Sequence, residues 1–220
     1  MNRFGLTIAV PRGALLSGSL DALDRAGIDT SEVRTNDRKL LFAEIGVVTM
    51  RPSDVPTYVE AGAADIGITG KDVLMEHPER QIFELADLGF GRCQMVVASE
   101  GGPDRAAEAL GRLGVMRIAT KYPRIAAAYF EQSGRQAEMV TVNGSVELAP
   151  LTGLADAIVD LMATGVTLRE NGLVVREEIA EVTARLVANR VAHRLQADAI
   201  EEFAALITAT GDFAAQSPAA

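Results

Sequence analysis

Short apolar runs alternate with amphipathic segments along most of the chain. The runs have the length of buried strands, and the segments between them place apolar residues at helical spacing. The predicted strands lie at 6–10, 64–69, 82–88, 92–99, 116–120, 138–142 and 157–159, with two more within 174–189. The predicted helices lie at 14–26, 51–61, 106–113, 124–132, 146–154 and 196–210. This order of elements predicts an α/β fold with mixed sheets.

Three segments are less regular. Residues 29–39 are mostly polar and are interpreted as a surface loop. Residues 39–45 and 46–50 predict two strands, joined as a hairpin or separated by a bulge. Ser53 or Asp54 is expected to cap the helix that follows them.

A Gly-x-Gly break at 89–91 separates two of the strands and predicts a crossover between two lobes. A return near 175–185 would then build the first lobe from both ends of the chain. We expect lobe I to hold 1–91 with 180–210, lobe II to hold 92–179, and 211–220 to form a disordered tail. An interlobe cleft would collect the loops at 11–13, 69–71, 120–122 and 160–168.

The stretch 155–173, ADAIVDLMATGVTLRENGL, contains the most informative pattern. A buried strand ends at Asp160, and a small-residue turn follows it. Thr167 with Glu170 three places on predicts a capping box, and therefore a helix that begins there. Asn171-Gly172 predicts the end of this helix within about one turn.

A strand, a tight loop and a helix start together favour an anion site, because the first amides of a helix have no internal acceptors. Thr164 and Thr167 add hydroxyl donors, and Gly165 lets the backbone approach a phosphate closely. The carboxylate of Asp160 could accept hydrogen bonds from a sugar diol. The pattern therefore suits a ribose 5-phosphate, although a capped helix after a buried strand would look the same.

Two other cations, Arg12 and Lys71, have two interpretations each, and one histidine has a single preferred one. Arg12 follows the first strand, where open α/β sheets bind ligands, or it is a solvated loop residue. Thr69-Gly70-Lys71-Asp72 predicts a second loop–helix junction with Thr69 as the cap, where Lys71 reaches a phosphate or only solvent. His193 beside Arg194 is interpreted as a surface residue.

Composition excludes several function classes. A formal net charge of −9 disfavours binding to nucleic acid or to an anionic membrane. One cysteine, Cys93, and two histidines are too few for a zinc site, and the single cysteine suits a reducing cytosol. We expect no export signal and no membrane span, because neither the first ten residues nor any later segment is apolar for long enough.

Several separate stretches, in the same order, resemble one family. They are AVPRGALL at 9–16, DRKL at 37–40, RPSDVPTYVEAGAADIGITGKDVL at 51–74, LGFG at 88–91, RIATKYP at 117–123, NGSVELAP at 143–150 and the stretch 155–173. Together they are similar to ATP phosphoribosyltransferase, the first enzyme of histidine biosynthesis. The resemblance runs from about Leu6 to about Val191.

The resemblance implies a fold and a reaction. The fold would be that of two-lobed periplasmic-binding-protein-like (type II) proteins. The reaction would join N1 of the ATP adenine to C1 of phosphoribosyl pyrophosphate (PRPP) and release pyrophosphate, which Mg2+ accompanies. Because adenine N1 is the nucleophile, the reaction needs no Ser, Cys or His. Fixed arginines can stabilise the charge on the leaving group.

The resemblance also implies roles for individual residues. PRPP would bind Asp160 and the loop Ala163, Thr164, Gly165, Val166, Thr167 and Leu168, together with Asp156 and Glu147. Catalysis would depend on Arg38 and Arg12. ATP would bind Arg12, Arg51, Gly70 and Lys71. No protein ligand for a metal is implied.

Two positions depart from the family's pattern. Many members have Lys-Gly-Arg where this chain has Arg12-Gly13-Ala14, so we expect Arg12 and Arg38 to replace the missing arginine. Val166 stands where Arg or Asn is frequent, which is expected to weaken phosphate binding.

The short distance from the last predicted helix to residue 220 is typical of the family's short form. That form works in the cytoplasm with a regulatory subunit resembling histidyl-tRNA synthetase, as a homodimer within a hetero-octamer. Two alternatives stay open at this point. One is a two-lobed solute-binding or effector protein without catalysis, and the other is a phosphoribosyltransferase with another acceptor.

Overall fold

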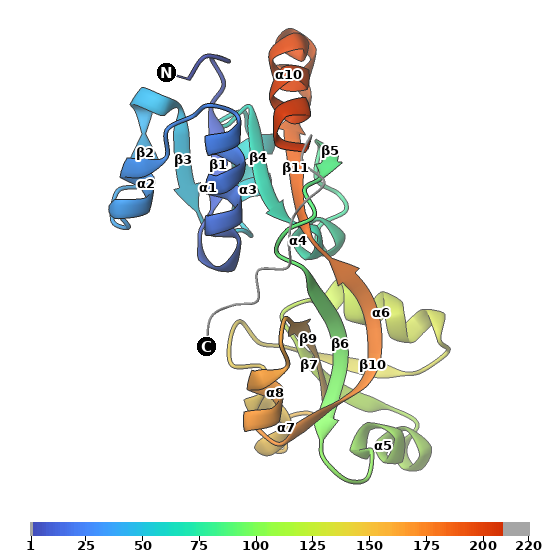
Figure 1. The fold of residues 1–220 in the computed structure, drawn as a ribbon. Coiled ribbons are helices and arrows are strands. Elements are labelled where there is room, and N and C mark those ends of the chain that lie inside the picture. Colours follow the sequence, from blue (N-terminus) through green and yellow to red (C-terminus); the bar gives the residue numbers. More distant parts are fainter. Residues whose placement is uncertain (1, 209–220) are drawn as a thin grey trace. The chain divides into compact units, whose positions relative to one another are not determined.

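The computed structural model describes residues 2–208, so the expected tail at 211–220 lies outside the described residues. The chain forms two compact units, coloured along the sequence in Figure 1. Unit 1 is built from residues up to Gly91 and from Thr183 onward, and unit 2 is Arg92–Val182. The expected return at 179/180 falls inside β10 (Leu173–Val182), and the structure divides the chain at the end of that strand.

Among the described residues, unit 1 contains a six-stranded mixed sheet in the order β2-β3-β1-β4-β11-β5. Its strands β1 (Ile8–Pro11), β3 (Val47–Met50) and β4 (Ile66–Gly70) run parallel. The strand β11 (Ala184–Asn189) returns antiparallel between β4 and β5 (Ile82–Asp87). The short strand β2 (Leu41–Phe42) pairs antiparallel with β3.

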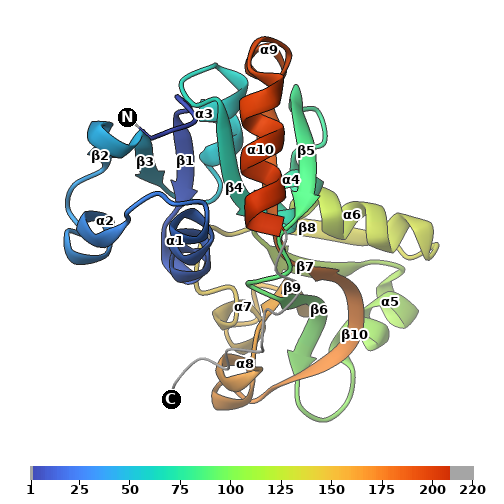
Figure 2. The ribbon, with the colours of Figure 1, turned by 45° about the horizontal axis from the view of Figure 1, so that its top comes forward.

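Helices cover both faces of this sheet. On one face, α1 (Leu16–Arg25) lies beside α10 (Ala197–Thr208), as Figure 2 shows. Ile8, Leu20 and Phe203 belong to the apolar core on that face. On the opposite face, α3 (Val55–Glu60) packs Val55 and Val59 against Ala9 and Val187 of the sheet. Neighbouring residues of β1 thus serve different cores, as the two-residue period of a strand requires.

Within the described residues, unit 2 contains a five-stranded mixed sheet in the order β10-β6-β9-β7-β8. Its strands β7 (Met116–Thr120), β8 (Ala137–Thr141) and β9 (Ala157–Met162) run parallel. The long strand β6 (Cys93–Glu100) pairs antiparallel with β9 and with β10. Four helices complete the described part of the unit: α5 (Arg105–Leu113), α6 (Pro123–Gln132), α7 (Leu148–Leu151) and α8 (Val166–Glu170).

The structure corrects several local predictions. Residues 29–39 are not only a loop, because they contain α2 (Ser31–Thr35). That helix is held by contacts that a local pattern does not reveal: Arg34 pairs with Asp24, and Asp24 accepts from the amide of Thr30. The expected strand 39–45 is β2 followed by a 3-10 turn, η2 (Ala43–Ile45), which ends at Gly46 with φ +65°.

Thr69 is not the cap of α4 (Lys71–Glu76). Gly70 is the N-cap residue, and the Thr69 hydroxyl donates to the carbonyl oxygen of Pro52 at 2.8 Å. Thr69 is fully buried, so its hydroxyl must find a partner inside the unit.

A helix at the end of β11 was missed by the sequence patterns. This helix, α9 (Arg190–Leu195), carries His193 and has Asn189 as its N-cap residue. The Asn189 side chain accepts from the amides of Val191 and Ala192, and its Nδ2 donates to the carbonyl oxygen of Val59.

None of the helices within residues 2–208 has the length and the apolar character that a membrane-spanning helix needs.

Candidate functional site

The parallel strands β7, β8 and β9 end at one edge of the unit 2 sheet. Ligands of open α/β sheets bind beyond this edge. Three connections begin there: the turn at 120–122, the loop before α7, and the loop Ala163–Gly165 before α8. They carry Lys121, Glu147 and Thr164, respectively.

Asp160 lies within β9, two residues before the strand ends at Met162. Its side chain is only 17% exposed, and its Oδ1 accepts from the amide of Leu161 at 2.8 Å. The ammonium of Lys121 lies 3.6 Å from the same oxygen. Burial raises the pKa of Asp160, the charge of Lys121 opposes this rise, and the negative charge of Glu147 adds to it. The group is therefore a largely buried acid whose ionised form is favoured by the charge of Lys121 and by the hydrogen bond from the Leu161 amide.

The turn that carries Lys121 is fixed by Thr120. The buried Thr120 hydroxyl donates to the carbonyl oxygen of Val159 at 2.7 Å and accepts from the amide of Tyr122 at 2.9 Å. Tyr122 is itself buried, and the Lys121 ammonium lies 5.0 Å from its ring centroid. The side chains of Thr120 and Lys121 were not among the expected site residues, although the motif RIATKYP contains both.

The loop after β9 differs in detail from the expected capping box. The helix α8 begins at Val166, with Gly165 as its N-cap residue at φ +72°, so the capping box at Thr167 is wrong. Thr167 lies inside the helix, where its carbonyl oxygen accepts from the amide of Asn171. Gly165, in the left-handed conformation, caps the helix, so that its first residue is Val166 and not Thr167. The spacing of apolar residues does not reveal a cap of this kind. The expected stop at Asn171-Gly172 is confirmed.

The exposed side of this loop presents Ala163, Thr164, Val166 and Thr167, while Leu168 is buried. Leu168 packs in the same apolar cluster as Ile158 of β9. Arg169 donates to the carbonyl oxygen of Thr164 at 3.2 Å, which ties the helix back to the loop. Leu168 and Arg169 therefore hold the loop against unit 2, while its other side chains are exposed to solvent.

Asp156 does not lie with the other candidates. It precedes β9, at the opposite end of the strand from the loop Ala163–Gly165. Its carboxylate accepts from the amide of Arg117 at 2.7 Å and lies 3.6 Å from the Arg117 guanidinium. The carboxylate thus joins the start of β7 to the start of β9, which is a structural role.

The candidates of unit 1 lie at the carboxyl edge of its own sheet. Pro11 pairs with Met50, so Arg12 after β1 and Arg51 after β3 are neighbours in register. Arg12 is held by donation from Nε to Thr49 Oγ1 at 3.0 Å and from Nη2 to the carbonyl oxygen of Lys39 at 3.1 Å. Its guanidinium is therefore oriented before any ligand binds.

The remaining unit 1 candidates differ in exposure. Arg38 and Arg51 are exposed. Gly70 ends β4 and is buried, and an added Cβ there would meet Asp72 Oδ1 at 2.0 Å, so a larger residue requires the Asp72 carboxylate to move. Lys71 pairs with Glu84 at 2.7 Å. A phosphate would have to compete with Glu84 for this ammonium.

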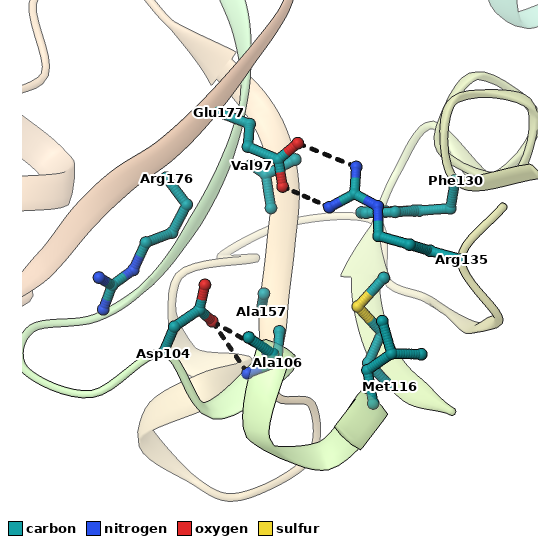
Figure 3. Close-up of a pocket in the computed structure, with 11 residues that line it drawn as sticks. Val97, Asp104, Ala106, Met116, Phe130, Arg135, Ala157, Arg176 and Glu177 are labelled. Carbon is teal, nitrogen blue, oxygen red and sulfur yellow. Dashed lines mark hydrogen bonds and ion pairs between the residues drawn. The ribbon is translucent and has the colours of Figure 1, made fainter. Parts of the chain in front are cut away.

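A separate pocket lies in unit 2, between α5, α6 and β10 (Figure 3). Its apolar lining includes Val97, Met116 and Phe130. Its polar groups have partners: Arg135 pairs with Glu177, and Asp104 caps α5. Among the described residues that line it, none belongs to the expected site. The ion pair fastens β10 to the segment that follows α6.

Comparison with known structures defines the class of protein first. The chain has the fold of periplasmic-binding-protein-like α/β proteins. It matches the aliphatic sulphonate binding protein SsuA from Escherichia coli with a TM-score of 0.56 and 13% identity, over 91% of this chain and 70% of that one. This likeness concerns the fold alone.

Closer relatives define the family. A family model described as ATP phosphoribosyltransferase (HisG) matches residues 51–209. The ATP phosphoribosyltransferase of Rubrobacter xylanophilus is 53% identical, over 87% of this chain and 90% of the relative. A structure of the ATP phosphoribosyl transferase (HisG:HisZ) complex from Thermotoga maritima matches with a TM-score of 0.75 and 32% identity, over 92% of this chain and 98% of that one. The chain belongs to the ATP phosphoribosyltransferase family.

Proposed function

We propose that this chain transfers the phosphoribosyl group of PRPP to N1 of ATP and releases pyrophosphate, the first step of histidine biosynthesis. Family membership supports the reaction. The structural observation that carries the proposal is the placement of a largely buried acid, Asp160, on the strand that leads into an open loop of small residues and threonines.

Unit 2 would bind the ribose and its 5-phosphate. The carboxylate of Asp160 accepts hydrogen bonds from the ribose hydroxyls, and Glu147, whose charge acts on Asp160, is proposed to share this task. The loop from Ala163 to Leu168 receives the 5-phosphate through backbone amides of the first turn of α8 and through the exposed hydroxyls of Thr164 and Thr167. Val166 offers no side-chain donor, so its amide alone contributes. Asp156 is left out of this site, because it is engaged with Arg117.

Unit 1 would supply cations for the leaving group and for ATP. Cleavage of the C1–O bond develops negative charge on the departing pyrophosphate, which oriented donors stabilise without reorganisation. Arg38 and Arg12 are proposed for this role, with Arg12 held by Thr49 and Lys39. Arg12, Arg51, Gly70 and Lys71 are proposed to contact ATP. Ala14 supplies no cation. Arg12 and Arg38 are therefore proposed to provide the stabilisation of pyrophosphate that an arginine at this position would give.

Magnesium is proposed to enter with the substrate. Among residues 2–208, no three His, Cys, Asp or Glu groups gather as a candidate metal site. Mg2+ commonly binds substrate phosphates and keeps several waters. The pyrophosphate oxygens of PRPP would therefore hold the ion.

The chain is further proposed to work in the cytoplasm with a regulatory subunit resembling histidyl-tRNA synthetase, as a homodimer within a hetero-octamer. The similar Thermotoga maritima protein is described as a HisG:HisZ complex, which supports a partner subunit. ATP and PRPP are cytoplasmic metabolites, which supports the location.

The test mixes the purified chain with ATP, PRPP and Mg2+, with and without the regulatory subunit, and follows the absorbance of the adduct. Wild type is expected to form the adduct, and Asp160→Ala is expected to fold with an unchanged circular dichroism spectrum but without turnover. Arg112→Met, which removes an exposed cation from the last turn of α5, is the control with full activity. Adduct formation with another nucleotide but not with ATP would overturn the assignment of ATP as the acceptor. Wild-type rates in the Asp160→Ala variant would overturn the assignment of Asp160 to the PRPP site.

A further inference from the structure

Lys121 occupies a defined position beside Asp160. Ala119 of β7 pairs with Ile158 of β9, and both belong to the apolar cluster on one face of the unit 2 sheet. Asp160 follows Ile158 by two positions within β9, so the strand period directs it to that same face, and Lys121 is the first residue after β7. The observed distance from Lys121 Nζ to Asp160 Oδ1 is 3.6 Å.

The surroundings of Asp160 offer few other charges. Glu147, just before α7, is the second titratable group that acts on it, and it opposes ionisation. On β6, the residue paired with Asp160 is the apolar Val96. On α8, the guanidinium of Arg169 is directed to the carbonyl oxygen of Thr164. Lys121 is thus the cation that offsets the burial of this carboxylate.

The charge of Asp160 matters for the chemistry of a sugar diol. An ionised carboxylate only accepts hydrogen bonds and can accept from both ribose hydroxyls through its two oxygens, whereas a protonated carboxyl uses one oxygen as an O–H donor and accepts less well. Burial and Glu147 both favour the protonated form. A site that binds ribose through this group therefore needs a compensating positive charge.

We propose that Lys121 is a positioning residue for phosphoribosyl transfer: its ammonium keeps the Asp160 carboxylate ionised and directed at the ribose hydroxyls. This role rests on the proposed function. Three features hold Lys121 in place: the Thr120 hydroxyl bonded to Val159, the Tyr122 amide bonded to Thr120, and the Tyr122 ring beneath the ammonium. A residue that only solvated the surface would not need such a fixed turn.

The first experiment measures Asp160 directly, in the complete unliganded chain. Carboxyl-carbon NMR follows its titration, with Asp160→Asn used to assign the signal. In Lys121→Met the midpoint is expected to rise by about 1 pH unit, at the low end for loss of a nearby opposite charge because the ammonium is partly solvated. Lys121→Arg should stay close to wild type. Arg112→Met, which removes a cation near the opposite end of β7, should leave the midpoint unchanged. An unchanged midpoint in Lys121→Met overturns the proposal.

The second experiment follows kcat/KM for PRPP against pH in the assay with the regulatory subunit. In the pH profile of kcat/KM, the acid limb of the Lys121→Met variant should move to higher pH by the same amount as the NMR midpoint. At pH values above this limb, the kcat/KM of the variant should equal that of wild type. A loss of activity that is equal at every pH would mean that Lys121 contacts the substrate itself, and would overturn the positioning role. If wild type forms no adduct at all, the proposed function fails, while the NMR result still decides whether Lys121 controls Asp160.

Discussion

The hydroxyl of Thr120 donates a 2.7 Å hydrogen bond to the carbonyl oxygen of Val159, across the parallel pair of β7 and β9. The same hydroxyl accepts from the amide of Tyr122. One buried side chain therefore fixes the turn that carries Lys121 to the strand that carries Asp160. The geometry at the carboxyl edge of unit 2 depends on this connection.

Thr120→Val removes both hydrogen bonds and keeps the shape of the side chain. We expect a loss of about 1–3 kcal/mol in the free energy of unfolding, because a carbonyl and an amide are left buried without that partner. The loss is measured by urea denaturation. Thr120→Ser keeps the hydroxyl and should retain most of the stability. Equal stability of the Val variant and wild type would contradict this account of the turn.

Gly165→Ala tests the left-handed cap of the loop. Gly165 and Gly172 have φ values of +72° and +68°, so alanine at either position should cost about 1 kcal/mol of stability. At Gly165 the added Cβ would also meet Arg169 Nη1 and Met162 Sδ at 3.2 Å, whereas at Gly172 it meets nothing within 4 Å.

Gly172→Ala is thus the matched control. We expect Gly165→Ala to raise KM for PRPP by about tenfold, equivalent to roughly 1.4 kcal/mol of binding, because the loop that receives the 5-phosphate must shift. Gly172→Ala should leave KM unchanged. Parallel effects of the two variants on KM would argue against phosphate binding at this loop.

Arg38→Ala tests the proposed charge stabilisation by unit 1. Since Arg38 is exposed, its removal should leave the melting temperature unchanged. Turnover is expected to fall by about 10²–10³-fold, the usual loss when one donor to a developing negative charge is removed. Arg38→Lys should recover only part of the rate, because an ammonium lacks the planar fork of the guanidinium. Full turnover by the alanine variant would exclude a catalytic role.

Glu177 links stability to pH. Its bidentate bond with Arg135 holds the pKa of the carboxyl below its usual value of 4.5, and the Tyr129 hydroxyl donates to it at 2.7 Å. A lowered acid pKa stabilises the folded state above the unfolded value, and this contribution disappears as pH falls through the folded value. Glu177→Gln should therefore cost about 1–2 kcal/mol at pH 7, and its stability should approach that of wild type below pH 4.5.

Denaturant titrations at pH 7 and at about pH 4 measure this difference. Glu138→Gln changes an exposed carboxylate of β8 and is expected to alter the free energy of unfolding by less than about 0.5 kcal/mol at either pH. A loss in Glu177→Gln that stays constant between the two pH values would contradict the linkage to ionisation.

Sequence patterns predicted the elements that depend on local period. The strand Met116–Thr120 has the expected bounds, and α1, α5, α6 and α10 lie within two residues of the expected starts. Elements that depend on distant partners were missed. Residues 29–39 look polar, and α2 forms there because Arg34 reaches Asp21 and Asp24 of α1. Thr69 looks like a cap, but burial commits its hydroxyl to Pro52.

The candidate site shows the same division. The order of acid, loop and threonine could be recognised from the sequence, because Asp160 and Thr164 are close along the chain. The neighbour of Asp160 could not be recognised, because Lys121 is distant along the chain and only the pairing of β7 with β9 brings the two together. Conversely, Asp156 is close to Asp160 in sequence but lies at the other end of the same strand.

The position of β11 between β4 and β5 has a consequence for biosynthesis. When translation has passed Val182, every described strand of unit 2 has been made, whereas the sheet of unit 1 still lacks an inner member. The sheet of unit 1 is therefore completed only after every described strand of unit 2 has been made, and until then β4 and β5 lack a partner on the sides that β11 will occupy. The first part of the polypeptide to be synthesised is therefore the last to be completed.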